Sequence, residues 1–73
     1  MDAHSFYNVQ VWDLRSRNFS IQEIADEANL DPIDVVQRLS FDGFNQYTVT
    51  ASELQEAGLD GPDAEQFGID VVR

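Results

Sequence analysis

The chain has 73 residues, 42% of them hydrophobic, and a net charge of −10 at pH 7 from fourteen acidic and four basic residues. This length predicts one domain with a small core, and the absence of cysteine excludes disulfides and thiolate metal sites. The chain shows neither a charged-then-apolar leader nor a long apolar run, so we expect a cytoplasmic protein without a membrane span. An acidic surface repels nucleic acid and attracts basic partners, although a high-salt host would favour the same composition.

The first segment, residues 5–17, fits two patterns. Tyr7, Val11 and Leu14 recur at the spacing of an amphipathic helix. Tyr7, Val9 and Val11 also alternate as they would in a strand. We expect a helix, because the helical hairpin that follows needs one to pack against.

The middle of the chain predicts two helices joined by a tight turn. Ser20 and Glu23 form a capping box, in which the hydroxyl accepts from the backbone N–H of Glu23 and the carboxylate accepts from that of Ser20. Asn29 tolerates the left-handed conformation that ends a helix. Asp31 should cap the second helix, and Pro32 suits its first position, where no N–H is needed.

The core should form where these helices face one another and the first segment. Apolar residues recur there at intervals of three and four. The side chains expected to be nearly fully buried are those of Trp12, Leu14, Ile24, Leu30, Val35 and Leu39.

The second half predicts a short extended segment and one or two short helices. Its elements in chain order are a β-prone segment at 46–50, a helix from the capping box Thr50-Ala-Ser-Glu53 to Gly58, a turn or short helix from Asp60 to Gly68, and a tail at 69–73 suited to extended structure. Within it, Glu56-Ala-Gly-Leu-Asp-Gly-Pro62 is similar to Glu27-Ala-Asn-Leu-Asp-Pro32. Duplication of a hairpin and chance similarity of turn chemistry both explain this likeness.

The stretch from Val11 to Leu39 resembles the tri-helical helix-turn-helix family, which includes sigma-factor region 4 and the DNA-binding domains of resolvases and repressors. It has an apolar pair, then Ser-x-x-Glu-Ile-Ala, a turn, and Val-x-x-x-Leu at the family's spacing. Asn18 and Asn29 stand where the family has turn glycines. The resemblance implies DNA binding, with the second hairpin helix in the major groove.

The sequence therefore predicts a mainly α fold in a single domain of residues 1–73. A tri-helical helix-turn-helix unit should occupy residues 1–42. A C-terminal extension at residues 43–73, with a short extended segment and one or two short helices, should pack on it.

The outward face of the second hairpin helix is the candidate partner-binding site. With Val35 and Leu39 turned inward, steps of 100° place five residues on or beside that face. They are Ile33, Asp34, Val36, Gln37 and Ser40. Gln37 could pair with adenine and Ile33 with a thymine methyl. Two readings stay open, because this face could instead be covered by Val49, Leu54 and Leu59 of the second half.

Arginines are the candidates for contacts with DNA phosphates. These are Arg15, Arg17 and Arg38, and none lies at the centre of the outward face. In residues 1–40, seven acidic residues against three arginines leave a charge of −4. Because phosphate contacts supply much of the affinity for DNA, a monomer of this kind should bind DNA poorly.

Catalysis, cofactors and metals are not expected. His4 is the one histidine and should lie on the surface, and no Cys–His or Ser–His–Asp set can be assembled. Carboxylates at helix starts serve as caps. Asp42-Gly43 and Asp60-Gly-Pro-Asp63 lack the alternating ligands of a calcium loop.

The sequence thus favours a non-catalytic interaction module, a small regulator that contacts another protein, which could carry a basic surface. DNA binding as an oligomer, or in high salt, is an alternative that the charge disfavours. A third hypothesis is an acidic mimic of nucleic acid, for which residues 41–73, with a charge of −6, would supply the surface.

Overall fold

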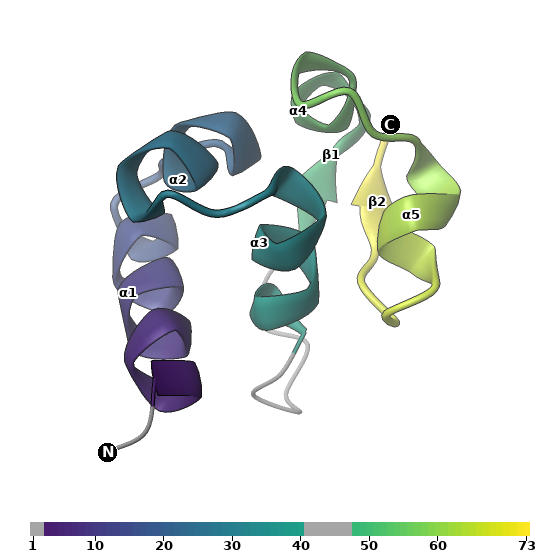
Figure 1. The fold of residues 1–73 in the computed structure, drawn as a ribbon. Coiled ribbons are helices and arrows are strands. Elements are labelled where there is room, and N and C mark those ends of the chain that lie inside the picture. Colours follow the sequence, from purple (N-terminus) through teal and green to yellow (C-terminus); the bar gives the residue numbers. More distant parts are fainter. Residues whose placement is uncertain (1–2, 41–47) are drawn as a thin grey trace.

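The computed structural model describes the backbone of residues 3–40 and 48–73, with side chains from Tyr7 to Ser40 and from Thr48 to Arg73. Our predictions for the side chain of His4, for Asp42-Gly43 and for residues 46–47 lie outside the described residues. Within these ranges no helix is long and apolar enough to cross a membrane. The elements are α1 (Ala3–Ser16), α2 (Ile21–Ala28), α3 (Pro32–Leu39), β1 (Val49–Thr50), α4 (Ala51–Glu56), α5 (Gly61–Glu65) and β2 (Val71–Val72) (Figure 1).

The predicted fold class is confirmed, since three helices are followed by a short extended segment and two short helices. The first segment is a helix, α1, rather than a strand. Val11 is fully buried on α1, and Leu14 nearly so. The indole N–H of Trp12 donates to the carbonyl oxygen of Arg38 at 2.9 Å, which ties α1 to the end of α3. Trp12 packs against the core and is partly buried, not nearly fully buried as predicted.

The predicted capping box at the start of α2 is present. The backbone N–H of Glu23 donates to Ser20 Oγ at 3.2 Å, and the N–H of Ser20 donates to Glu23 Oε1 at 2.9 Å. Asp31 occupies the N-cap position of α3, but its side chain makes no capping hydrogen bond. The fixed φ of Pro32, at the start of α3, favours the helix there without that bond.

Four helices end in the same way. Their turn residues have positive φ: Asn18 (67°), Asn29 (56°), Gly58 (75°) and Gly68 (78°). In each case the next residue donates its N–H to the carbonyl five positions earlier: Phe19 to Leu14, Leu30 to Ala25, Leu59 to Leu54 and Ile69 to Ala64. These are Schellman-type endings, in which the apolar residue after the turn folds back onto the core. Leu30 packs on the core only in part, which corrects our prediction of nearly full burial.

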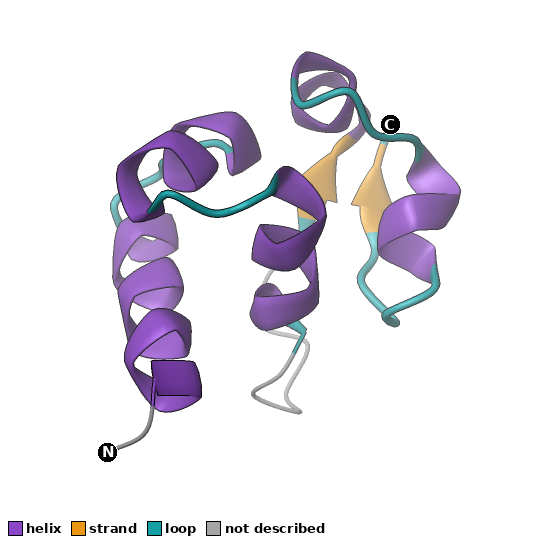
Figure 2. Cartoon of the chain, viewed as in Figure 1, coloured by secondary structure: helices purple, strands orange, loops and turns teal. Residues whose placement is uncertain are grey.

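The two short strands lie side by side and parallel, with Val49 opposite Val71 and Thr50 opposite Val72 (Figure 2). The chain crosses from β1 to β2 through α4 and α5. The tail predicted as extended is thus part of a sheet. One hydrophobic cluster joins both halves of the molecule, with Val11, Leu14, Ile21, Ile24, Ala25, Val35, Val36 and Leu39 from the first and Val49, Leu54, Ala64 and Ile69 from the second.

Candidate partner-binding site

The candidate site lies on α3, which is packed on two sides. Helices α1 and α2 contact it on one side, and α5 contacts it from the second half of the chain. Val35 and Leu39 are buried as predicted, but Val36 is also fully buried. Val36 therefore does not face a partner, and of the two readings left open, cover by the second half of the chain is the one that holds for it. Neighbouring positions 100° apart can both be buried when a helix is covered on two sides.

The other predicted site residues remain at the surface to different degrees. Gln37 is exposed, whereas Ile33, Asp34 and Ser40 are half-buried. Ser40 caps the end of α3, where its hydroxyl donates to the carbonyl oxygen of Gln37 at 2.7 Å. The face that α3 can offer a partner is thus a narrow one, formed by Ile33, Asp34 and Gln37.

Arg15 is held inside the molecule and not presented to solvent as a phosphate contact, which corrects our expectation for it. Its guanidinium meets both oxygens of Glu53, with Nη1 at 2.6 Å from Oε1 and Nη2 at 2.9 Å from Oε2. It also donates to the carbonyl oxygens of Phe19 at 2.9 Å and Thr48 at 2.7 Å. The side chains of Arg15 and Glu53 are only 15% and 10% exposed. All of these contacts would have to be broken before Arg15 could reach a ligand.

Glu53 receives hydrogen bonds from three parts of the chain. Besides Arg15, the backbone N–H of Thr50 donates to Oε2 at 2.8 Å and that of Ile21 donates to Oε1 at 3.3 Å. Burial by itself raises the pKa of Glu53, but the hydrogen bonds from Arg15 and Thr50 outweigh it and hold the pKa below its ordinary value. The sequence identified Glu53 only as a helix cap. Nothing in the local pattern indicated a partner 38 positions away.

The two remaining candidate arginines also bind within the molecule. Arg38 Nη1 donates to Asn8 Oδ1 at 2.9 Å, and its guanidinium carbon lies 5.3 Å from the centre of the Tyr7 ring. Arg17 pairs with Asp13 one turn back on α1 at 3.2 Å, and both of these side chains are exposed. The three arginines are therefore not arranged along the outward face of α3.

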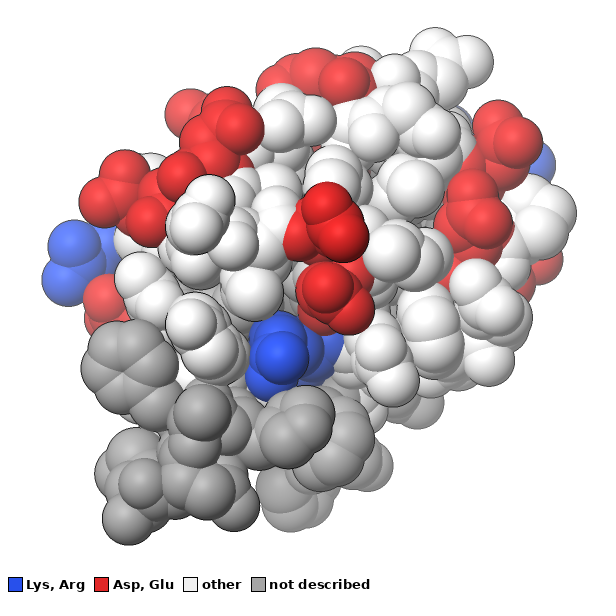
Figure 3. Space-filling model, viewed as in Figure 1, with Lys and Arg blue, Asp and Glu red and all other residues white. Residues whose placement is uncertain are grey.

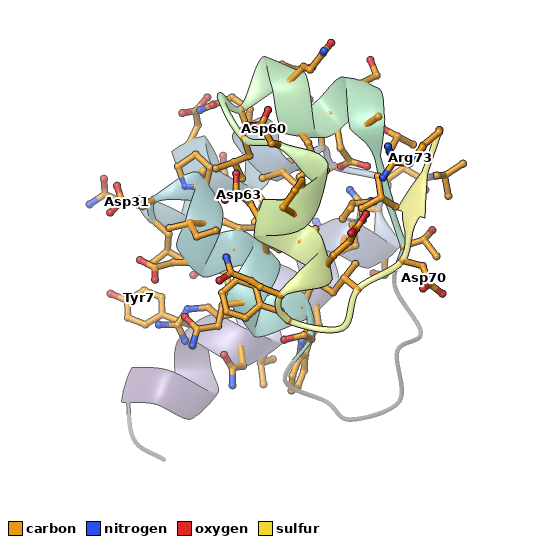
Figure 4. All side chains as sticks on the ribbon, turned by 90° about the vertical axis from the view of Figure 1, so that its right-hand side faces the viewer. Tyr7, Asp31, Asp60, Asp63, Asp70 and Arg73 are labelled. Atoms are coloured by element: carbon orange, nitrogen blue, oxygen red, sulfur yellow. The ribbon has the colours of Figure 1, made fainter. Side chains whose placement is uncertain are left out.

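Among the charged groups on the visible surface, most are carboxylates (Figure 3). Figure 3 shows them spread across one face of the molecule with few cations among them. Asp60 and Asp63 lie together at the start of α5, and Asp31 lies at the start of α3 (Figure 4). The backbone N–H of Asp60 donates to Asp63 Oδ2 at 2.8 Å. Over the described residues, no three His, Cys, Asp or Glu side chains come together as a metal site.

No protein family, curated protein or solved structure matches this chain.

Proposed function

We propose that this protein is a non-catalytic helix-turn-helix interaction module, a small regulator that acts by contacting another protein. The observation that carries the proposal is the engagement of Arg15, Arg17 and Arg38 in contacts within the molecule. A DNA-binding hairpin needs such cations at the phosphates. Arg15 would first have to leave its buried partner Glu53, and Arg38 would have to leave Asn8. Arg17, in contrast, can exchange partners, because its pair with Asp13 is exposed. One exposed arginine is few for a DNA-binding surface.

The packing of α3 supports the same proposal. A recognition helix enters the major groove with one side free along its length. Here α5 contacts α3, and Val36 belongs to the shared core. The remaining face is polar at Gln37 and Asp34 and apolar at Ile33, a mixture that suits a protein contact.

The charge of the surface indicates the chemistry of the partner. A molecule with a net charge of −10 is attracted to basic surfaces and repelled by phosphate backbones. The same charge supports a second candidate function, an acidic mimic that occupies the basic groove of a DNA-handling protein. The exposed carboxylates at the starts of α3 and α5 are the groups such a groove would meet.

A DNA titration tests the proposal against direct DNA binding. Fluorescence anisotropy with a labelled random-sequence duplex should show no submicromolar binding at physiological ionic strength. The duplex should remain unbound when Arg17, the most exposed of the three arginines, is replaced by alanine. Submicromolar binding by the wild type that weakens steeply with salt would contradict the proposal.

Variants on α3 test the protein contact itself. Gln37→Glu adds a charge at the exposed centre of the face and should reduce cross-linking to the partner, with an unchanged circular dichroism spectrum. Gln55→Glu adds the same charge at an exposed position on α4 and is the matched control. Equal cross-linking by both variants would exclude this face of α3 as the contact surface.

A further inference from the structure

The outer edges of β1 and β2 differ in whether side chains hydrogen-bond their outward backbone groups. In a parallel ladder, alternate residues of each strand direct both backbone groups to the same neighbour. The N–H of Val49 donates to the carbonyl oxygen of Asp70 at 3.2 Å, so the backbone groups of Val49 point toward β2. Its neighbours Thr48 and Thr50 therefore direct their backbone groups to the opposite, outer edge of β1.

The outer edge of β1 is closed by side chains. Arg15 Nη2 donates to the carbonyl oxygen of Thr48 at 2.7 Å, and Glu53 Oε2 accepts from the N–H of Thr50 at 2.8 Å. The Arg15–Glu53 ion pair thus supplies a donor and an acceptor where a third strand would otherwise pair. Such closure of an edge prevents pairing with other chains.

The outer edge of β2 has no corresponding closure. By the same alternation, Val71 directs its N–H and carbonyl oxygen away from β1. In the portions of the chain that the structure describes, neither group has a hydrogen-bond partner. Asp70 and Val72 lie on one face of β2, where both are exposed and Val72 is 51% exposed. Figure 4 shows β2 at the margin of the molecule, with Asp70 and Arg73 at its two ends.

We propose that the outer edge of β2 is a docking site for an extended, basic segment of a protein partner. This inference rests on the proposed function and adds a second contact to the face of α3. The backbone of the segment would donate to and accept from Val71, as in strand addition to a sheet edge. On the exposed face of β2, a basic side chain would meet Asp70 and an apolar one would cover Val72. The net charge of −10 makes a basic segment a better occupant than a second copy of this acidic chain.

The Arg73–Glu65 ion pair lies next to this edge and does not close it. Arg73 Nη2 lies 2.9 Å from Glu65 Oε1, which joins the end of β2 to α5, and the two side chains are 73% and 51% exposed. An exposed pair of this kind contributes little to stability and can exchange partners. A basic side chain of the docked segment can replace Arg73 at Glu65.

The experiment uses the full chain and a short synthetic peptide that alternates threonine with lysine and valine and is blocked at both ends. Two-dimensional NMR should show saturable binding, with slowed hydrogen exchange at the Val71 amide. Val71→Pro removes the outward N–H at a position where proline is compatible with an edge strand, and should weaken binding about tenfold. Asp70→Asn should also weaken binding and reduce its salt dependence, whereas Asp26→Asn, a matched change on α2, should not.

A second peptide keeps the test decisive if Val71→Pro perturbs the fold. The same sequence with N-methylated alternate amides retains its charge but cannot pair as a strand, and the wild-type protein should not bind it. Equal binding of both peptides would show a purely electrostatic contact and overturn the proposal. Concentration-dependent dimerisation of the wild type that Val71→Pro abolishes would identify a second copy as the occupant and would also overturn it. Absence of peptide binding, with cross-linking through Gln37 intact, would reject the β2 site and leave the proposed function standing.

Discussion

Asn29 is the residue at which one side chain decides where a helix ends and the next begins. Its φ of 56° lies in the left-handed region. The N–H of the next residue, Leu30, donates to the carbonyl oxygen of Ala25 and closes the turn. Asn reaches this region more easily than other residues with a side chain, and glycine more easily still. The position therefore constrains the backbone rather than the side chain, which is exposed.

Substitutions at this position should follow that constraint. Asn29→Val should lower the free energy of unfolding by about 1–2 kcal/mol, because a β-branched residue is strained at positive φ. Asn29→Gly, the control, should be neutral or mildly stabilising. Urea unfolding monitored by circular dichroism measures both. Equal stability of the wild type and Asn29→Val would mean that the turn does not constrain φ in solution.

At the scale of elements, the Arg15–Glu53 ion pair fastens the second half of the chain to the first. Glu53 caps α4, accepts from Ile21 at the start of α2 and binds Arg15 on α1. The partners on the two halves lie far apart in sequence, so the pair forms only in the folded chain. Because both side chains are largely buried, the loss of one partner leaves a desolvated charge behind.

Replacement of Glu53 should therefore destabilise the fold and change its response to acid. Glu53→Gln should cost about 1.5–3 kcal/mol at neutral pH, the usual range for hydrogen bonds to charged groups. The folded-state pKa of Glu53 lies below its ordinary value of 4.5. Its stabilisation is thus complete above the unfolded-state pKa and declines as the pH falls through the folded-state pKa. Urea unfolding between about pH 7 and pH 3 should show a smaller loss of stability on acidification for Glu53→Gln than for the wild type.

The control for this pH series is Glu27→Gln, which removes a carboxylate from an exposed position on α2. It should lose about as much stability on acidification as the wild type. If Glu53→Gln and the wild type lose equal stability, the ion pair has no role in the acid response.

At the scale of the whole molecule, a single core carries the stability of both halves. Within the described residues, the buried members of the hydrophobic cluster come from each helix and from Val49 on β1, with Ile69 just before β2. A chain of this size has few kcal/mol of net stability to lose. Damage to the centre of the core should therefore unfold the three-helix unit and the C-terminal extension together.

Leu39→Ala tests this dependence. Leu39 is 1% exposed at the end of α3, and its truncation should cost about 2–5 kcal/mol through lost burial and the cavity left behind. Val9→Ala, at a side chain that is 53% exposed on α1, should change stability by less than about 0.5 kcal/mol. Thermal unfolding by circular dichroism should show one transition for both halves. Retention of a folded C-terminal half in Leu39→Ala would contradict a shared core.

Features that depend on neighbours in the chain could be predicted from the sequence. The capping boxes at Ser20 and Thr50 and the turn at Asn29 rest on contacts between residues a few positions apart. The side-chain types required for such contacts are therefore visible locally. The core positions Ile24, Val35 and Leu39 were likewise predicted, because helical spacing brings apolar residues to one face.

The candidate site was predicted less well, because which of its residues are exposed depends on the segments that pack against α3. For Val36 the sequence left open both a partner contact and cover by the second half of the chain, and the residue is buried, with α5 on the second side of α3. Arg15 was a candidate for a phosphate contact if the protein bound DNA, and it instead binds Glu53. Neither contact can be predicted from the spacing of nearby residues, because each joins residues from opposite halves of the chain.

The sequence alone determined the capped starts of α2 and α4, the turn at Asn29 and the acidic charge, all of which follow from short-range chemistry and composition. Only the tertiary structure decided that Val49 and Val71 meet in a parallel ladder, that Arg15 and Glu53 close one edge of it, and that the edge at Val71 stays open. These features require segments about twenty or more residues apart to meet. Their meeting is fixed by burial of the shared core, to which both halves contribute.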